Sequence, residues 1–104
     1  MTKGTADGMV DGARRAVLAR IGGTVQGVWY RGWTVETAQS LGLSGWVRNR
    51  ADGTVEALFA GPVAAVDHML VACQDGPPAA RVSGVTVSAA ADPGEGVFEQ
   101  RPTL

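Results

Sequence analysis

An Asp-Gly pair near the middle of the chain most constrains what this sequence can fold into. Asp52 and Gly53 lie between two short runs, 45–49 and 54–60, that are rich in apolar and β-branched residues. An Asp-Gly pair between such runs is a strong signal for a tight antiparallel hairpin. The two runs are therefore predicted to be neighbouring strands of one sheet.

The segments on either side of this hairpin show the periodicities of strands and helices. Residues 17–25 alternate between two faces and form a predicted strand, one face of which carries Val17, Ala19, Ile21, Gly23 and Val25. Apolar residues at three- and four-residue spacing predict one helix that stops at Gly42. A second predicted helix begins near Pro62 and ends before a Gly-Pro-Pro stretch. Residues 81–89 and 97–101 are further predicted strands.

The order of these elements determines the predicted fold class. It is β-α-β-β-α-β plus one short C-terminal strand, without an internal repeat. This order is typical of the α+β, ferredoxin-like split β-α-β sandwich, in which an antiparallel sheet is covered on one face by both helices. A right-handed crossover makes the first strand parallel to the second, with the third between them. The loop after the first strand and the end of the second are therefore predicted to lie at the same rim.

Length and composition indicate a single folded domain. The chain has 104 residues, of which 45% are hydrophobic and 18% charged, a balance that supports one hydrophobic core. Residues 1–15 contain several glycines and no sustained periodicity, so we predict a flexible leader there. The predicted domain spans residues 16–104.

Charge and cysteine usage narrow the expected partners. The formal net charge is −1 and no run of Lys or Arg forms a basic stripe, so no nucleic-acid partner is expected. Cys73 has no second cysteine or neighbouring histidine, so neither a disulfide nor a metal site is predicted, and no cofactor is expected. Residues 1–13 lack an apolar stretch, so neither a signal peptide nor a membrane span is predicted there. We expect a cytoplasmic monomer without a membrane span, although exposed edge strands leave self-association open.

The segment that joins the first strand to the first helix is the candidate functional site. Its backbone N–H groups can converge on an anion at the helix N-terminus, and Gly27 permits the tight turn. Arg31 lies where the loop becomes the helix, and a guanidinium can give a phosphate two parallel hydrogen bonds. On spacing alone, a plain connection with a solvated arginine is the simpler interpretation, so both alternatives stay open.

Two motifs resemble those of the acylphosphatase family. The first follows the pattern Gly-x-Val-Gln-Gly-Val-x-Phe-Arg, with tyrosine in place of phenylalanine, and consists of Gly23, Val25, Gln26, Gly27, Val28, Tyr30 and Arg31. The second consists of Gly45, Trp46, Val47, Arg48, Asn49, Asp52, Gly53, Val55 and Glu56. The resemblance extends from Val17 to about Pro102.

The resemblance implies a metal-free hydrolase that cleaves the carboxyl–phosphate bond of acyl phosphates. It implies that Arg31 binds the phosphate charge and that Asn49 orients the attacking water. It also implies that the substrate is bound by Gln26, Gly27, Val28, Trp29, Tyr30 and Arg31. Because the carboxylate of an acyl phosphate is a good leaving group, the reaction mainly requires that the enzyme position the phosphoryl group and the attacking water. Trp29 and Trp33 are interpreted either as packing residues or as rings that stack on an acyl group.

The sequence disfavours two other classes of function and leaves a third open. An RNA-binding module needs exposed aromatic residues on the sheet. The only aromatic residue in the first and third predicted strands is Phe59. A cysteine phosphatase needs an arginine six positions after its cysteine, whereas Ala79 stands there, and the helical spacing around Cys73 indicates a core position. A non-catalytic module that binds phosphorylated metabolites through the same loop stays open.

Overall fold

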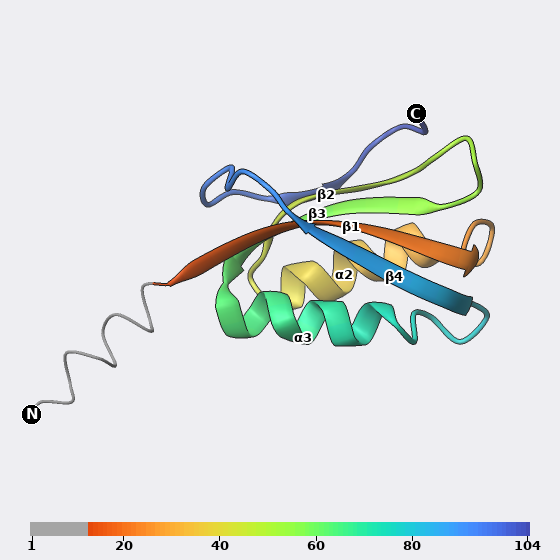
Figure 1. Cartoon of the computed structure of the whole chain (residues 1–104), viewed down its shortest axis with the longest axis horizontal. Helices are drawn as coiled ribbons and strands as arrows, with labels where there is room; N and C mark the ends of the chain where they lie inside the picture. Colours follow the sequence, from red (N-terminus) through yellow and green to blue (C-terminus); the bar gives the residue numbers. More distant parts are fainter. Residues whose placement is uncertain (1–12) are drawn as a thin grey trace, which may run out of the picture.

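The structure, a computed structural model, describes residues 13–104, which form one sheet and two helices (Figure 1). In chain order the elements are β1 (Arg14–Thr24), α2 (Tyr30–Ser40), β2 (Ser44–Asn49), β3 (Val55–Pro62), α3 (Val63–Cys73), β4 (Arg81–Ala89) and β5 (Phe98–Gln100). The predicted α+β order is confirmed. No helix in this part of the chain is long and apolar enough to cross a membrane.

The five strands lie in the order β4-β1-β3-β2-β5 across the sheet. β3 lies between β1 and β2 and is antiparallel to both, as the right-handed crossover predicts. β4 pairs antiparallel with the other edge of β1. The antiparallel sheet is thus confirmed for the four longer strands. The short β5 pairs in parallel with β2, which makes the sheet mixed at that edge.

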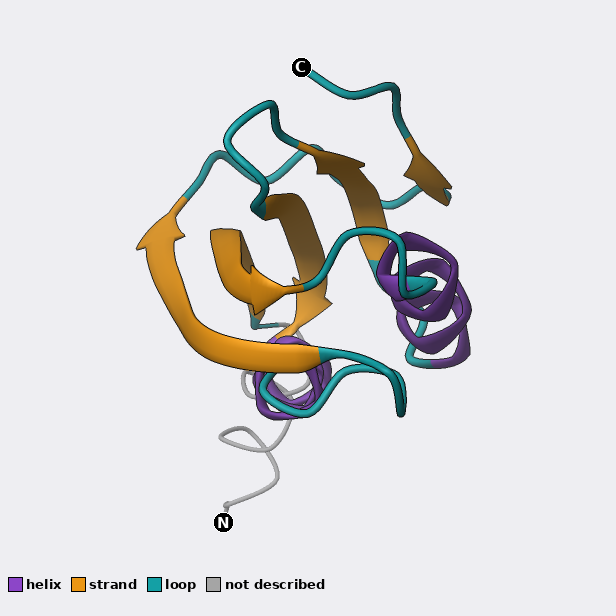
Figure 2. Ribbon diagram, turned by 90° about the vertical axis from the view of Figure 1, so that its right-hand side faces the viewer, coloured by secondary structure: helices purple, strands orange, loops and turns teal. Residues whose placement is uncertain are grey.

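Both helices cover the same face of the sheet, α2 next to β2 and β5, and α3 next to β1 and β3 (Figures 1 and 2). Of the two faces predicted for residues 17–25, the one with Val17, Ala19, Ile21 and Val25 points into the core, whereas Gly23 on the same face is exposed. Phe59 of β3 and Phe98 of β5 stack in this core with their ring centroids 5.6 Å apart. Burial of such apolar side chains is the dominant stabilising contribution.

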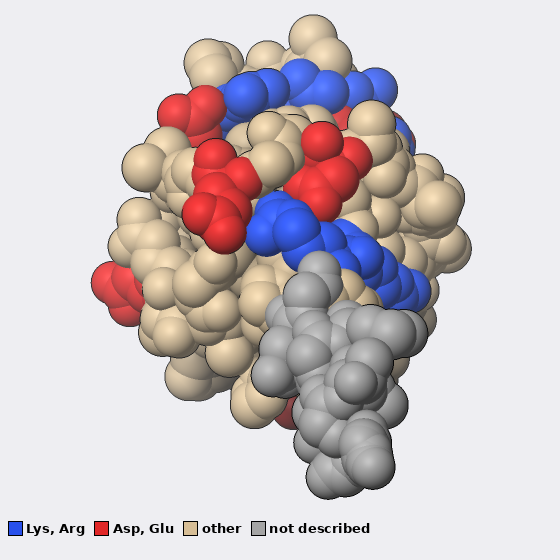
Figure 3. Space-filling view, turned by 90° about the vertical axis from the view of Figure 1, so that its left-hand side faces the viewer, with Lys and Arg blue, Asp and Glu red and all other residues tan. Residues whose placement is uncertain are grey.

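β1 begins earlier than predicted. Arg14 and Arg15 already pair with the end of β3. Their guanidinium groups bind the carboxylates of Asp92 and Asp67, so ion pairs rather than an apolar pattern accompany this end of the strand. On the face drawn in Figure 3, acidic side chains likewise lie beside basic ones. The rest of the predicted leader, residues 1–12, lies outside the described residues.

A network of charged side chains surrounds Glu56 on the sheet face opposite the helices. Glu56 is 6% exposed, and its carboxylate accepts a 2.9 Å hydrogen bond from Arg48 Nε. Arg50 and Arg20 nitrogens lie 3.3 and 3.5 Å from its two oxygens. Burial opposes ionisation, but the Arg48 hydrogen bond and the three positive charges outweigh it and lower the pKa of Glu56. These contacts join β1, β2 and β3.

We expect Glu56→Gln to lower the free energy of unfolding near neutral pH by about 1–3 kcal/mol, because the charge that binds the three arginines is lost. A carboxyl whose pKa is lowered by folding stabilises the protein above its unfolded pKa and loses this contribution as the pH falls through the folded pKa. Wild type should therefore lose more stability than the variant on acidification. Urea unfolding at several pH values measures this, and equal losses in both proteins would contradict it.

Candidate active site

The loop between β1 and α2 contains two residues in the left-handed backbone region. Gly27 has φ of 77°, and Trp29 has φ of 68° and ψ of 23°. A Cβ added at Gly27 would meet no atom within 4 Å, so backbone conformation rather than space favours glycine there. Among the described residues, Trp29 is the sole non-glycine with positive φ, a conformation that costs roughly 1–3 kcal/mol.

This loop ends at a helix terminus with free backbone donors. No side chain of the described residues caps α2, and its first turn contains no acidic residue. The backbone bond that begins the helix runs from Trp33 N to Trp29 O at 3.0 Å, so the N–H groups before Trp33 have no helical partner. The helix dipole adds partial positive charge at the same place. This end of α2 is therefore suited to bind an anion.

A cavity of about 220 Å³ opens at this end of α2. Its lining comes from the loop, the first turn of α2, the end of β2 and β5, and consists of Val25, Gly27, Trp29, Tyr30, Arg31, Gly32, Asn49 and Gln100. Sites for drug-sized ligands span roughly 300–1,000 Å³, so this cavity suits a smaller one. The loop after β1 and the end of β2 thus meet at one rim, as predicted from the topology.

Arg31 lies in the first turn of α2 and is partly exposed. Within residues 13–104 no carboxylate lies within salt-bridge distance of it. Carboxylates do bind Arg14, Arg15, Arg20, Arg48, Arg50 and Arg101, whereas the exposed Arg81, like Arg31, has no such partner within these residues. The Arg31 guanidinium is therefore free, within the described part of the chain, to give an anion its charge and two parallel hydrogen bonds.

Asn49 combines a place in the cavity lining with an unpartnered polar atom. It is the last residue of β2, and its side-chain Oδ1 is buried. No group in the described residues donates a hydrogen bond to this oxygen. A buried acceptor without a partner typically costs about 1–3 kcal/mol, so a water or ligand that donates to Asn49 would remove a real penalty.

Gln26 and Val28 lie in the loop, but their side chains do not line the cavity. The Gln26 carboxamide donates to the backbone carbonyls of Arg50 at 2.8 Å and Thr54 at 2.9 Å, both in the hairpin after β2. The Val28 side chain packs against the core. The predicted part of these two residues in substrate binding therefore rests on their backbone N–H groups.

Tyr30 joins the start of α2 to the end of α3. Its ring is buried, lies 5.3 Å from the Trp33 ring, and its hydroxyl donates a 2.7 Å hydrogen bond to the Cys73 carbonyl. Burial, reinforced by the neighbouring Cys73, raises the pKa of Tyr30, so this hydroxyl stays protonated. Burial also raises the pKa of the Cys73 thiol to about 12, and this residue occupies the core as predicted. Trp33 packs against the core too.

Three residues of the lining were not among the predicted site residues: Val25, Gly32 and Gln100. Val25 and Gly32 adjoin the predicted loop in sequence. Gln100 lies in β5, where it is the partner of Val47 in the neighbouring parallel strand β2. The strand pattern over residues 97–101 was the available signal for it, but that pattern does not reveal which strand β5 pairs with.

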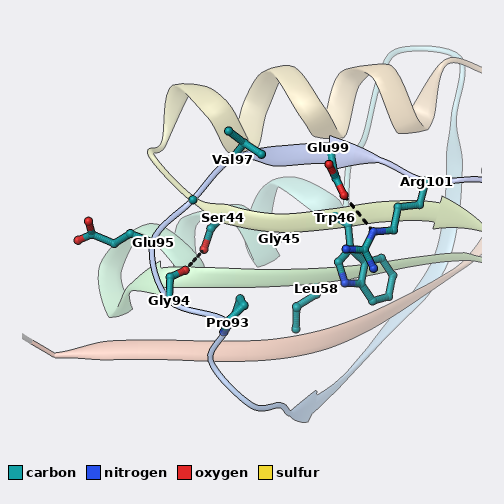
Figure 4. Close-up of a pocket in the computed structure, with 11 residues that line it drawn as sticks. Ser44, Gly45, Trp46, Leu58, Pro93, Gly94, Glu95, Val97, Glu99 and Arg101 are labelled. Carbon is teal, nitrogen blue, oxygen red and sulfur yellow. Dashed lines mark hydrogen bonds and ion pairs between the residues drawn. The ribbon is translucent and has the colours of Figure 1, made fainter.

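A second hollow, of about 270 Å³, lies beside β2 and β5 on the face that carries Trp46 (Figure 4). Several of its polar groups already have partners, since Ser44 donates to the Gly94 carbonyl at 2.7 Å and Arg101 binds Glu99 at 3.1 Å. Carboxylates contribute to its lining, which disfavours an anion. The cavity at α2 is therefore the better candidate for an anion site.

We expect Gln26→Ala to lower the free energy of unfolding by about 1–3 kcal/mol and to weaken the binding of inorganic phosphate, because the loop loses its two bonds to the hairpin. Thermal unfolding with and without phosphate measures both effects. Gln39→Ala is a matched control, since that carboxamide donates to the Phe98 carbonyl and neither residue lines the cavity. A phosphate-induced rise in Tm that is the same in Gln26→Ala as in wild type would contradict this expectation.

Comparison with known proteins supports the resemblance seen in the motifs. The family model for acylphosphatase matches residues 17–100. An acylphosphatase from Rhodospirillum rubrum is 64% identical over 90 residues, which are 86% of this chain and 99% of that protein. One from Rhizorhabdus wittichii is 51% identical over 91 residues, 88% of this chain and 92% of that protein.

Solved structures of acylphosphatases also resemble this chain. The crystal structure of acylphosphatase from Bacillus subtilis superposes with a TM-score of 0.81 at 31% identity and covers 86% of this chain and 99% of that one. An acylphosphatase from Coxiella burnetii has the same TM-score at 30% identity, over 85% of this chain and 93% of that one. Because the family match runs from β1 to β5 and includes both motifs, this chain belongs to the acylphosphatase family.

Proposed function

We propose that this acylphosphatase holds the phosphoryl group of its substrate at the N-terminus of α2 and attacks it with a water molecule positioned by Asn49. As an acylphosphatase the protein hydrolyses acyl phosphates. The observation that carries the proposed mechanism is that Arg31 and Asn49 line one cavity and that the Asn49 Oδ1 has no hydrogen-bond partner within residues 13–104.

Phosphate binding in this proposal uses fixed donors. The phosphoryl oxygens accept hydrogen bonds from the N–H groups of residues 27–31 and two from the Arg31 guanidinium. Backbone donors at a helix terminus are already oriented before the substrate binds, so little reorganisation is needed as negative charge shifts during the reaction. The absence of a carboxylate partner for Arg31 within residues 13–104 supports this role.

Asn49 acts on the attacking water in this proposal. Its Oδ1 accepts a hydrogen bond from the water and leaves a water lone pair directed at phosphorus. A carboxamide does not take up a proton at neutral pH, so the proton passes to a phosphate oxygen. The water oxygen–phosphorus bond forms as the bond from phosphorus to the carboxyl oxygen breaks, and the products are a carboxylate and inorganic phosphate.

We also propose that the reaction needs neither a metal nor a cofactor. Among the described residues, the lining of the cavity contains no His, Cys, Asp or Glu, the usual metal-ligating side chains. The leaving group is a stable carboxylate, so the expulsion step does not require a Lewis acid. Hydrolysis that continues at the same rate in excess chelator is the expected result, and loss of activity that added metal restores would overturn this part.

Arg31→Ala should lower kcat/KM for acetyl phosphate by at least about 100- to 1,000-fold, because a preorganised charged donor is removed. Asn49→Ala should lower kcat strongly, since water is no longer held in line. Arg81→Ala is the matched control, because Arg81 is exposed and does not line the cavity. Circular dichroism checks the fold of each variant. Near-wild-type activity in folded Arg31→Ala or Asn49→Ala would contradict the proposal.

The pH dependence of hydrolysis tests the absence of an enzymic base. With no His, Asp or Glu in the lining, kcat/KM should show no inflection from an enzyme group near pH 7. A stopped assay in a set of overlapping buffers measures the profile. A bell-shaped profile centred near neutrality would point to a general base outside this mechanism.

Wild type that binds phosphate but hydrolyses no acyl phosphate would instead make the site a binding module.

A further inference from the structure

Trp29 occupies an unusual position for a large apolar side chain. It is 58% exposed, it lines the cavity, and it is not part of the buried core. Its backbone lies in the left-handed region, which a tryptophan rarely adopts. The backbone conformation lowers stability, and the ring, more than half exposed and outside the core, contributes little burial in return. Strain of this kind at the edge of a binding cavity points to a function.

Gly32 fixes where the Trp29 ring lies. A Cβ added at Gly32 would be 2.1 Å from Trp29 Nε1 and 2.7 Å from two other indole atoms, so the ring lies directly over this glycine. Gly32 lies inside α2 and does not have positive φ, so its backbone does not require glycine. Glycine within a helix is unfavourable, and the room it leaves for the indole accounts for it here.

The size of the cavity places the acyl group near this ring. The cavity is small, and in the proposed mechanism the phosphoryl group occupies it next to Arg31 and Asn49. An acyl group larger than acetyl must then extend over the rim. Trp29 is the exposed large apolar side chain of the lining. The lining offers no carboxylate for a cationic acyl group and no cation besides Arg31 for an anionic one.

We propose, on the basis of the function above, that the exposed face of the Trp29 indole binds the acyl group and that the enzyme prefers acyl phosphates with an aromatic acyl group. An aromatic ring can stack on the indole, whereas an acetyl group offers little surface to it. The indole is a specificity-determining group in this proposal, and the backbone N–H of the same residue belongs to the phosphate-binding loop.

The test compares benzoyl phosphate with acetyl phosphate as substrates of wild type and Trp29→Ala. The ratio of the two kcat/KM values should fall about three- to tenfold in the variant, mainly through a higher KM for benzoyl phosphate. Gly32→Ala, which displaces the ring without removing it, should lower the ratio in the same direction. Trp29→Phe restores an aromatic surface and should recover most of the preference.

Trp46→Ala is the matched control, since this tryptophan lines the other hollow (Figure 4) and should leave the ratio unchanged. A ratio in Trp29→Ala equal to that of wild type overturns the inference and leaves the proposed function standing. An equal loss for both substrates also overturns it, because the effect would then lie in phosphate binding. Wild type that hydrolyses neither substrate would refute the proposed function itself.

Discussion

Two hydrogen bonds from the Gln26 carboxamide hold the loop after β1 against the hairpin after β2, and the site depends on this link. The loop supplies the backbone donors and leads to Arg31, whereas the hairpin follows Asn49. The hairpin is itself stiffened by Asp52, whose Oδ1 accepts hydrogen bonds from the N–H and hydroxyl of Thr54 at 3.0 and 2.6 Å. A polar network thus brings two distant segments to one rim and keeps their spacing.

Local features that lower stability gather in the cavity lining. Trp29 has a left-handed backbone, Gly32 lies within a helix, and the Asn49 Oδ1 has no partner in the described residues. The core between the sheet and the helices offsets these costs, as is common at functional sites. The hollow near Trp46 is larger, but the Ser44 hydroxyl and the Arg101 guanidinium in it already have partners. Unsatisfied donors and acceptors, rather than volume, therefore distinguish the candidate site.

Local patterns in the sequence predicted most of the fold, because alternation over residues 17–25 and the turn at Asp52 depend on near neighbours. They did not predict that β5 pairs in parallel with β2, since that choice depends on long-range contacts such as Phe98 on Phe59. Gln100 was missed for the same reason. Family motifs rather than spacing identified Arg31 and Asn49. The cavity brings these two together, and their catalytic roles remain predictions.

In the proposed mechanism Arg31 binds the phosphoryl group and Asn49 positions the attacking water, so the two residues have separate roles. Calorimetric titration of inorganic phosphate into Asn49→Ala, with kcat measured on the same sample, tests this separation most directly. We expect a Kd for phosphate within about threefold of wild type together with a kcat lower by roughly 100-fold or more. Loss of phosphate binding in parallel with kcat would contradict it, because Asn49 would then act on the phosphate or on the shape of the site.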